Sequence, residues 1–413
     1  MKKPALLAAL AATLLLCLLS VPAFSAGFAM YEFSARGNAV GGAVVANPKD
    51  ASTMATNIAG MTQLDGGHVL AGATIIQPHQ DVETPEGDFR GQSPNWVPPH
   101  AYYTQQVTDR LWMGLGVFTR YGLSAEFDPE WPGRYNSYFA QIVSSSVVPG
   151  IAYKLTDTLS LGLGLEAMYF DFKQQKKVRT APGDVDGTLH GDSLGVGFNV
   201  SAHYHPIQPL RIGLAYRSLV EQRVTGRASF NNPAGLPPIF FQDTDAWGTI
   251  RLPDSVQAGV SYDILDNLTV EADVIWTRWS SYRNLTINYD KALMPTNPAS
   301  TSTMSEKNYK DVFRYCLGVE YGVLPWLDLR AGYVYDESPV RDSYADYLVP
   351  ANDRQIFSLG TGIKYDNWNF DVSYSYLWIM GRDVDARPED GVVDSNFKNG
   401  DAHMVGFSVG YKF

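Results

Sequence analysis

The feature that most constrains the fold is a repeated pattern of tight turns between stretches of alternating apolar and polar residues. Six turns recur roughly every fifty residues, and a tyrosine precedes each one. This repeat of a strand, a long loop, a second strand and a tight turn is typical of transmembrane β-barrels. The turns lie at residues 108–110, 156–158, 206–209, 265–267, 323–325 and 366–367.

The turns also set the number of strands. They join twelve strands, and one more precedes the first turn and one follows the last, at about residues 67–76 and 402–413. The sequence therefore predicts an all-β fold, a transmembrane antiparallel β-barrel of about 14 strands. Apolar and polar residues alternate in residues 268–277, so either face could line the lumen. Charges of both signs on consecutive strands favour the polar face, with Glu271 and Asp273 pointing inward.

The first 25 residues predict a secretory signal peptide. Lys2 and Lys3 precede an apolar run, which ends in a small-x-small site at residues 23–25. A retained membrane anchor is the alternative. No later run reaches the 18 or so apolar residues of a membrane helix. Cys17 lies in the leader, so Cys316 is the single mature cysteine and an intrachain disulfide is excluded.

Residues 26–62 differ from everything that follows them. They are polar and rich in small residues, with one apolar cluster near the start (Phe28, Met30, Tyr31 and Phe33). They lack the periodicity of a membrane helix or a core strand. We expect them to form a plug in the lumen of a barrel made by residues 63–413.

Several motifs resemble the FadL family of outer-membrane long-chain fatty-acid channels, which also includes aromatic-hydrocarbon channels. The matching segments are Ala26-Gly27-Phe28, Glu32-Phe33-Ser34, Trp131-Pro132-Gly133-Arg134-Tyr135, Tyr216-Arg217-Ser218 and Asp336-Glu337-Ser338-Pro339-Val340. One departure occurs near the end of the plug, where Ile58 replaces the proline of the family's Asn-Pro-Ala. The turn there, and any gating that depends on it, is open.

The resemblance implies passive, energy-independent uptake of long-chain fatty acids or similar hydrophobic compounds. A ligand would bind a groove between outer loops, pass to a pocket beside the start of the plug, and leave through a lateral gap in the wall. Loop 224–252 has an apolar concentration suited to the first step. The expected substrate-binding residues are Phe28, Phe33, Leu236, Ile239, Phe240, Phe241, Lys310 and Arg314.

Each of these assignments has a structural alternative. The loop residues could pack the loop onto the barrel rim, and the two phenylalanines could only anchor the plug. Lys310 and Arg314 are predicted to face inward, where they could pair with a fatty carboxylate or with Glu320 or Asp273. For plug contacts and gating we expect Gly27, Glu32, Asn57, Ile58 and Ala59, and for a wall gap Gly114 and Gly116.

The sequence predicts location in the outer membrane of a Gram-negative bacterium, with no cofactor and no metal site. Expected partners are a hydrophobic small molecule, outer-membrane lipids including lipopolysaccharide, and the barrel-assembly machinery, which would read the C-terminal strand ending in Phe413. The net charge of −11 argues against nucleic acid, because binding phosphates requires a basic surface.

Four other functions are considered. The ligand could be a monoaromatic hydrocarbon rather than a fatty acid. Asn199, Ser201 and His203 share an inward face and could form a barrel-embedded acyl hydrolase, although residues two apart on one strand rarely make the required hydrogen-bond chain. A general porin would have an open lumen rather than a plug. A TonB-dependent receptor would need a far larger plug.

Overall fold

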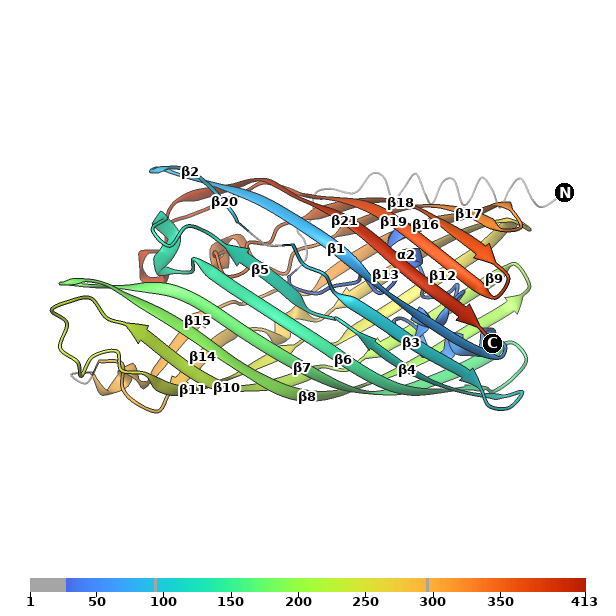
Figure 1. Ribbon diagram of the computed structural model, residues 1–413, viewed down its shortest axis with the longest axis horizontal. Helices are drawn as coiled ribbons and strands as arrows, with labels where there is room; N and C mark the ends of the chain where they lie inside the picture. Colours follow the sequence, from blue (N-terminus) through green and yellow to red (C-terminus); the bar gives the residue numbers. More distant parts are fainter. Residues whose placement is uncertain (1–26, 93–94, 295–296) are drawn as a thin grey trace.

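The wall is a single closed antiparallel β-barrel of 14 strands, counted over the residues that the structure describes. The computed structural model describes residues 27–92, 95–294 and 297–413, so the predicted leader lies outside the described residues. In Figure 1 the strands run obliquely along a cylinder, with tight turns at the right-hand end and long loops at the left. The wall strands are β1 (Gly67–Thr84), β3 (Pro99–Gln106), β4 (Leu111–Phe118) with β5 (Gly122–Glu126), β6 (Phe139–Lys154), β7 (Leu159–Thr180), β8 (Gly183–Ile207), β9 (Leu210–Arg217) with β10 (Val220–Asn231), β11 (Thr244–Leu252) with β12 (Ser255–Leu265), β13 (Leu268–Thr277), β16 (Val312–Leu324), β17 (Leu327–Asp336), β18 (Arg354–Tyr365), β19 (Trp368–Ile379) and β21 (Ser395–Lys412).

Shorter elements lie at the loop end and inside the barrel. Four short strands extend the loop end: β2 (Gly87–Arg90), β14 (Asn284–Tyr289), β15 (Ser302–Glu306) and β20 (Arg382–Val384). The helical segments are α2 (Ala35–Ala39) and the 3-10 turns η1 (Ala51–Ala55), η2 (Ile58–Gln63), η3 (Pro132–Tyr135), η4 (Trp279–Ser281), η5 (Pro298–Thr301), η6 (Asp342–Tyr344) and η7 (Pro388–Asp390). No helix in the described ranges is long and apolar enough to cross a membrane.

The predicted turns and faces are confirmed. All six turns join the strands expected, and the first strand pairs with the last, starting at His68 opposite Lys412, so that the barrel closes. Glu271 and Asp273 on β13 are buried inside, whereas Val274 is exposed on the outside. The predicted loop 224–252 is too long, because β10 continues to Asn231 and β11 begins at Thr244.

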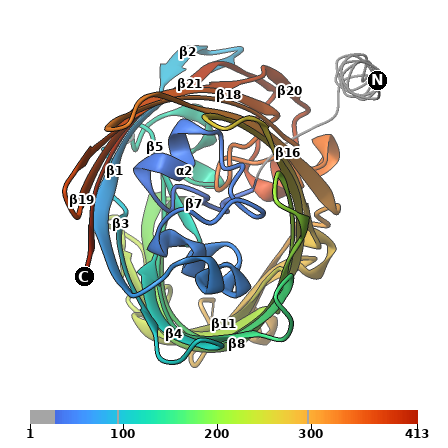
Figure 2. The same ribbon diagram turned by 90° about the vertical axis from the view of Figure 1, so that its right-hand side faces the viewer.

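Residues 27–66 lie inside the barrel, as Figure 2 shows in dark blue. The close fit depends on wall glycines, since a Cβ at Gly213 would lie 2.1 Å from Val45 O and one at Gly332 would lie 2.1 Å from Gly41 N. Any larger residue there would push the plug from the wall. Wall glycines that face the plug in the same way are Gly114, Gly150, Gly162, Gly164, Gly318 and Gly360.

Candidate functional site: plug, pocket and wall

The middle of the plug, residues 44–47, is held by two wall carboxylates. The backbone N–H groups of Val44 and Val45 donate to Asp273 Oδ2 over 2.8 and 3.0 Å. Those of Ala46 and Asn47 donate to Glu271 Oε1 over 2.6 and 3.3 Å. Both acceptors are buried and each takes two backbone N–H groups, so these four bonds fix this segment to β13, because a buried N–H without a partner costs free energy.

An ion-pair network holds the plug to β16 and β17. Arg36 Nε donates to Glu320 Oε2 over 2.9 Å, and Arg330 Nε reaches the same oxygen over 2.7 Å. Arg330 also pairs with Asp371 on β19 over 2.6 Å. Glu320, proposed from the sequence as an alternative partner for Lys310 or Arg314, is therefore occupied by cations from the plug and from β17.

The segment Asn57-Ile58-Ala59 fastens the end of the plug. Asn57 donates through Nδ2 to the carbonyl of Val45 in the plug and of Ala202 in the wall, over 2.8 and 3.1 Å. Ile58 takes the first position of η2, where proline would also be accepted. Its side chain lies over Gly164, where a Cβ would be 2.4 Å from Ile58 Cδ1, so isoleucine fills a hollow in the wall.

The polar trio proposed as an acyl hydrolase does not assemble. Ser201 Oγ accepts from the backbone N–H of Ala59 over 2.9 Å, and His203 Nε2 lies 3.0 Å from the carbonyl oxygen of Ala46. Both side chains therefore bind the plug backbone.

The start of the plug, residues 27–33, is held differently, by aromatic rings and by the wall backbone. The Phe28 ring is 3% exposed and lies 4.9 Å from that of Trp279 in an edge-on arrangement. Tyr121 and Tyr282 complete its surroundings, with ring centroids at 5.8 and 6.0 Å. Phe33 packs elsewhere, against Phe118 at 5.3 Å. Phe28 and Phe33 pack against these rings, and neither lines the pocket described next.

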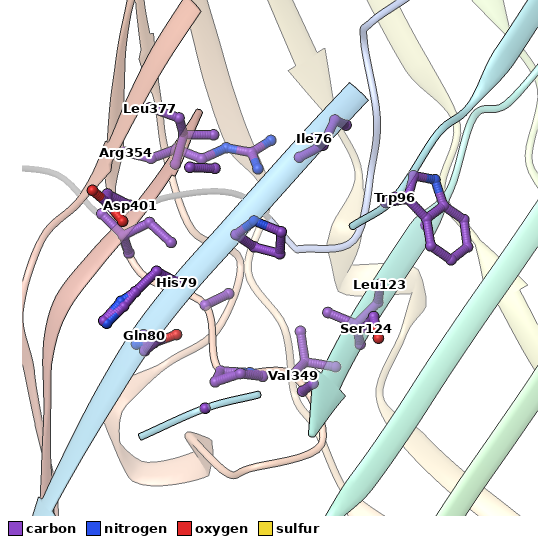
Figure 3. Close-up of a pocket in the computed structure, with 18 of the residues that line it drawn as sticks. Ile76, His79, Gln80, Trp96, Leu123, Ser124, Val349, Arg354, Leu377 and Asp401 are labelled. Atoms are coloured by element: carbon purple, nitrogen blue, oxygen red, sulfur yellow. The ribbon is translucent and has the colours of Figure 1, made fainter. Parts of the chain in front are cut away.

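A pocket of about 190 Å³ adjoins this start of the plug. Figure 3 shows side chains from β1, β5, β21 and the segments before β3 and β18 around it. The plug contributes Gly27, Ala29, Met30 and Glu32. Apolar surface comes from Ile76, Trp96 and Leu123, among others, and polar groups from His79, Ser124, Arg354 and Asp401. Gly27 and Glu32, expected at the plug, thus lie at the pocket itself.

The wall beside this pocket is poorly paired. β3 begins only at Pro99, opposite Ala73, so β1 beyond that point lacks β3 as a neighbour. Residues 91–92 and 95–98 lie beside β1 with few ladder bonds, including a two-way pair between Ile76 and Trp96 of 2.8 and 2.9 Å. Two consecutive prolines, Pro98 and Pro99, remove donors from this segment.

The next wall strand is interrupted at residues 119–121. Phe118 pairs with Ser146 and Gly122 with Val143, so four steps along one strand oppose three along the other, which is a bulge. The start of the plug binds here: Met30 N–H donates to Arg120 O over 2.8 Å, and Gly122 N–H donates to Phe28 O over 3.0 Å. The plug therefore pairs with the irregular point of the wall.

Gly114 and Gly116 do not mark this gap. Both lie in β4, paired with β3 on one side and β6 on the other. A side chain at Gly114 would collide with the plug, because a Cβ there would lie 2.6 Å from the sulfur atoms of Met54 and Met61. The interruption lies closer to the loops than the two glycines do.

Arg314 and Lys310, the two cations predicted to bind a fatty carboxylate, differ in their surroundings. Arg314 on β16 pairs with Asp336 over 2.6 Å and stacks on Tyr31 at 4.4 Å, so the alternative of pairing within the lumen applies, with a different acid from those expected. Lys310 precedes β16, and its N–H bonds to Pro339 O over 2.9 Å. Burial raises the pKa of Asp353 to about 7, and the charge of Lys310 acts on that carboxyl in the opposite direction.

The apolar residues of the outer loop 232–243 divide into two groups. Phe241 is buried with Val185 and Leu293, and Leu236 and Phe240 pack partly against this cluster. Ile239 is 56% exposed. The rim-packing alternative therefore describes Phe241, while Ile239 remains an accessible apolar contact.

The sequence did not identify the polar and aromatic residues that line the pocket. Trp96, His79 and Asp401 come from three distant segments, which only the closed barrel brings together. The signal available was local: Val97-Pro98-Pro99 cannot form a regular central strand.

A closed barrel with an internal plug, a pocket beside it and an irregular wall defines a class of outer-membrane channel for hydrophobic compounds. The family model "Outer membrane protein transport protein (OMPP1/FadL/TodX)" matches residues 16–413, and the chain belongs to this family of transport channels in the outer membrane of Gram-negative bacteria, whose members are not enzymes.

Curated relatives span the chain. It is 26% identical to a "Long-chain fatty acid transport protein" of Escherichia coli O6:H1 over 96% of each chain. It is 27% identical to "Putative outer membrane protein NMB0088" of Neisseria meningitidis serogroup B, over 98% of this chain and 99% of that one.

Solved structures share the fold. A Pseudomonas aeruginosa FadL homologue superposes with a TM-score of 0.83 at 18% identity, covering 94% of this chain and 100% of that one. The Pseudomonas putida toluene transporter TodX gives 0.74 at 16% identity, covering 94% and 99%.

Proposed function

We propose that the protein mediates passive, energy-independent uptake of long-chain fatty acids or similar hydrophobic compounds. A ligand contacts exposed apolar groups of the outer loops such as Ile239, enters the pocket beside the start of the plug, and leaves sideways between β1 and β5. The observation that carries this proposal is the pairing of the plug with the wall bulge at residues 120–122. Movement of residues 27–33 would remove bonds from the wall and enlarge the pocket in one step.

A fatty acid is the first candidate because the matched relative carries that name. The pocket volume favours a second candidate, a monoaromatic hydrocarbon. An apolar cavity of about 150 Å³ accepts benzene, so a pocket of about 190 Å³ has room for one aromatic ring, whereas a long acyl chain would extend beyond it unless the plug moves.

The test is uptake of labelled oleate and labelled toluene by a Gram-negative host that lacks its own channels for both compounds. Oleate uptake that requires the protein supports the fatty-acid proposal. Uptake of toluene alone assigns the second candidate. Uptake of neither compound, with the barrel folded in the outer membrane, contradicts the proposal. Lipopolysaccharide and the assembly machinery remain proposed partners, the latter through β21 and its terminal Phe413.

A further inference from the structure

A cluster of arginines stands on the outside of the barrel, above its apolar belt. Arg223 on β10 and Arg251 on β11 point away from the lumen, because they alternate with the buried Val224 and Ile250. Their side chains are 83% and 61% exposed. Arg278, which follows β13, and Arg283, in the next loop, line the same surface cavity of about 950 Å³.

The position of the cluster follows from strand register. Tyr216, Val256 and Trp276 lie opposite one another across β9, β12 and β13 and form one row on the outer face. Aromatic residues of this kind mark the membrane interface of barrels. On the loop side of this row, Arg278 follows Trp276 by two residues, Arg251 precedes Val256 by five and Arg223 follows Tyr216 by seven. The arginines thus lie between the aromatic row and the outer loops, on the side of the lipid phosphates of the outer leaflet.

The anchoring bonds leave much of each guanidinium available. Glu221 receives Arg223 Nε over 3.0 Å and Arg251 Nε over 3.4 Å, so one carboxylate orients two cations. Arg278 Nε donates to Asp254 over 2.6 Å. Because guanidinium carries five donors, a pair made through Nε leaves the terminal nitrogens directed at solvent, in the geometry that binds phosphate with two parallel bonds.

The two faces of β14 show that the cavity opens outward. Asn284, Thr286 and Asn288 of β14 line this cavity, whereas Leu285 and Ile287 line pockets on the inner side. Trp247, 47% exposed, adds an aromatic surface at its edge. The cavity therefore combines four arginines with one flat apolar group, against a chain whose net charge is −11.

We propose that this cluster is a binding site for the phosphorylated glucosamine head of lipopolysaccharide, the anionic glycolipid of the outer leaflet. The guanidinium groups of Arg223, Arg251 and Arg278 contact phosphate oxygens, and Trp247 contacts the sugar or the start of an acyl chain. The site fixes the height and rotation of β10–β13 in the outer membrane. It depends only on the outer-membrane location and is independent of which compound the channel transports.

The test measures binding of deep-rough lipopolysaccharide to the full mature protein in a neutral detergent with EDTA, so that no divalent cation bridges the partners. In Arg223→Gln/Arg251→Gln we expect the Kd to rise by about tenfold or more. The matched control, Arg110→Gln/Lys412→Gln, removes two exposed cations at the opposite end of the barrel and should leave the Kd unchanged. Binding by the wild type should weaken with salt.

Equal Kd values for wild type and Arg223→Gln/Arg251→Gln would overturn the proposal. Equal binding of lipopolysaccharide and its dephosphorylated form would also overturn the proposal, since the site would then recognise only acyl chains. Heat-modifiable electrophoretic mobility reports whether each variant is a folded barrel. If the double variant does not fold, Arg223→Gln alone serves, because that side chain is the most exposed of the pair.

Discussion

The middle of the plug and its start are held to the barrel by different kinds of contact. Residues 44–47 bind two buried carboxylates of β13 through four backbone hydrogen bonds. Residues 27–33 are held by aromatic rings from the bulge and from the segment after β13, and by a short backbone pairing with the bulge beside β5. The pocket adjoins this start of the plug.

The difference separates two tasks that one segment must perform. A plug that blocks solutes must stay bound to the wall, and four backbone hydrogen bonds to buried acidic side chains hold it there. A gate needs contacts of modest strength that can exchange, which aromatic packing and a few neutral bonds provide. We infer that residues 44–63 stay in place during uptake while residues 27–33 move.

The largest effect is expected from removing the contacts that hold the middle of the plug. In Glu271→Ala/Asp273→Ala, four buried N–H groups lose their acceptors at a cost of about 1–3 kcal/mol each, so the plug should leave the wall. Ion conductance in planar bilayers should rise well above that of the wild type. The control Glu221→Ala/Asp243→Ala removes two carboxylates from the outer surface. Unchanged conductance in the lumenal variant would contradict a firmly held plug.

The second prediction locks the poorly paired side of the wall. Ile76 and Trp96 exchange two hydrogen bonds, so their Cα atoms lie at about 5.5 Å, within the range for a disulfide. Ile76→Cys/Trp96→Cys should abolish uptake when oxidised and restore most of it after reduction. The buried Cys316 should not interfere.

A disulfide placed in the continuous β7–β8 ladder is the matched control. Tyr169→Cys/Leu194→Cys links directly opposed, exposed residues, and uptake should not respond to oxidation. If oxidation of Ile76→Cys/Trp96→Cys also leaves uptake unchanged, ligands do not leave between β1 and β5.

The third prediction weakens the start of the plug. Phe28→Ala removes a ring packed among Tyr121, Trp279 and Tyr282, at a local cost of about 3–5 kcal/mol. Gly27, Ala29 and Met30, which shape the pocket, would lose their position, so oleate uptake should fall by more than half. Phe28→Leu keeps most of the side-chain volume, so its oleate uptake should lie between that of the wild type and that of Phe28→Ala. Uptake unaffected by Phe28→Ala would show that the pocket forms without this anchor.

The barrel could be predicted from the sequence because its rules are local. Tight turns, tyrosines before them and period-two alternation are all readable along one strand, and the inward position of Glu271 and Asp273 followed from that alternation together with the charges on consecutive strands. That these two carboxylates bind the plug backbone could not be read in the same way, because the plug has no periodicity and its depth in the lumen depends on glycines from many strands.

The candidate site was predicted only in part for the same reason. Gly27 and Glu32 line the pocket, but Phe28, chosen for its aromatic ring, packs instead among Tyr121, Trp279 and Tyr282. The gap was placed at Gly114 and Gly116 because glycine weakens strands, whereas those glycines accommodate Met54 and Met61. A glycine pattern alone does not distinguish a wall opening from a wall that something approaches.

The smallest effect, and the one that bears on the ligand, is expected at Lys310. It lies outside the residues that line the pocket, in the segment before β16, and its charge acts on Asp353. If a fatty carboxylate passes this cation, Lys310→Met should weaken binding of a fatty acid more than binding of its methyl ester, by about 0.5–1.5 kcal/mol for one lost partly exposed interaction. Lys310→Arg should keep the preference, and Lys364→Met, at the opposite end of the barrel, should not alter it. Equal loss for acid and ester would remove Lys310 as a carboxylate partner. In that case the start of the plug, residues 27–33, recognises only the apolar surface of a ligand, and the small pocket favours an aromatic ring.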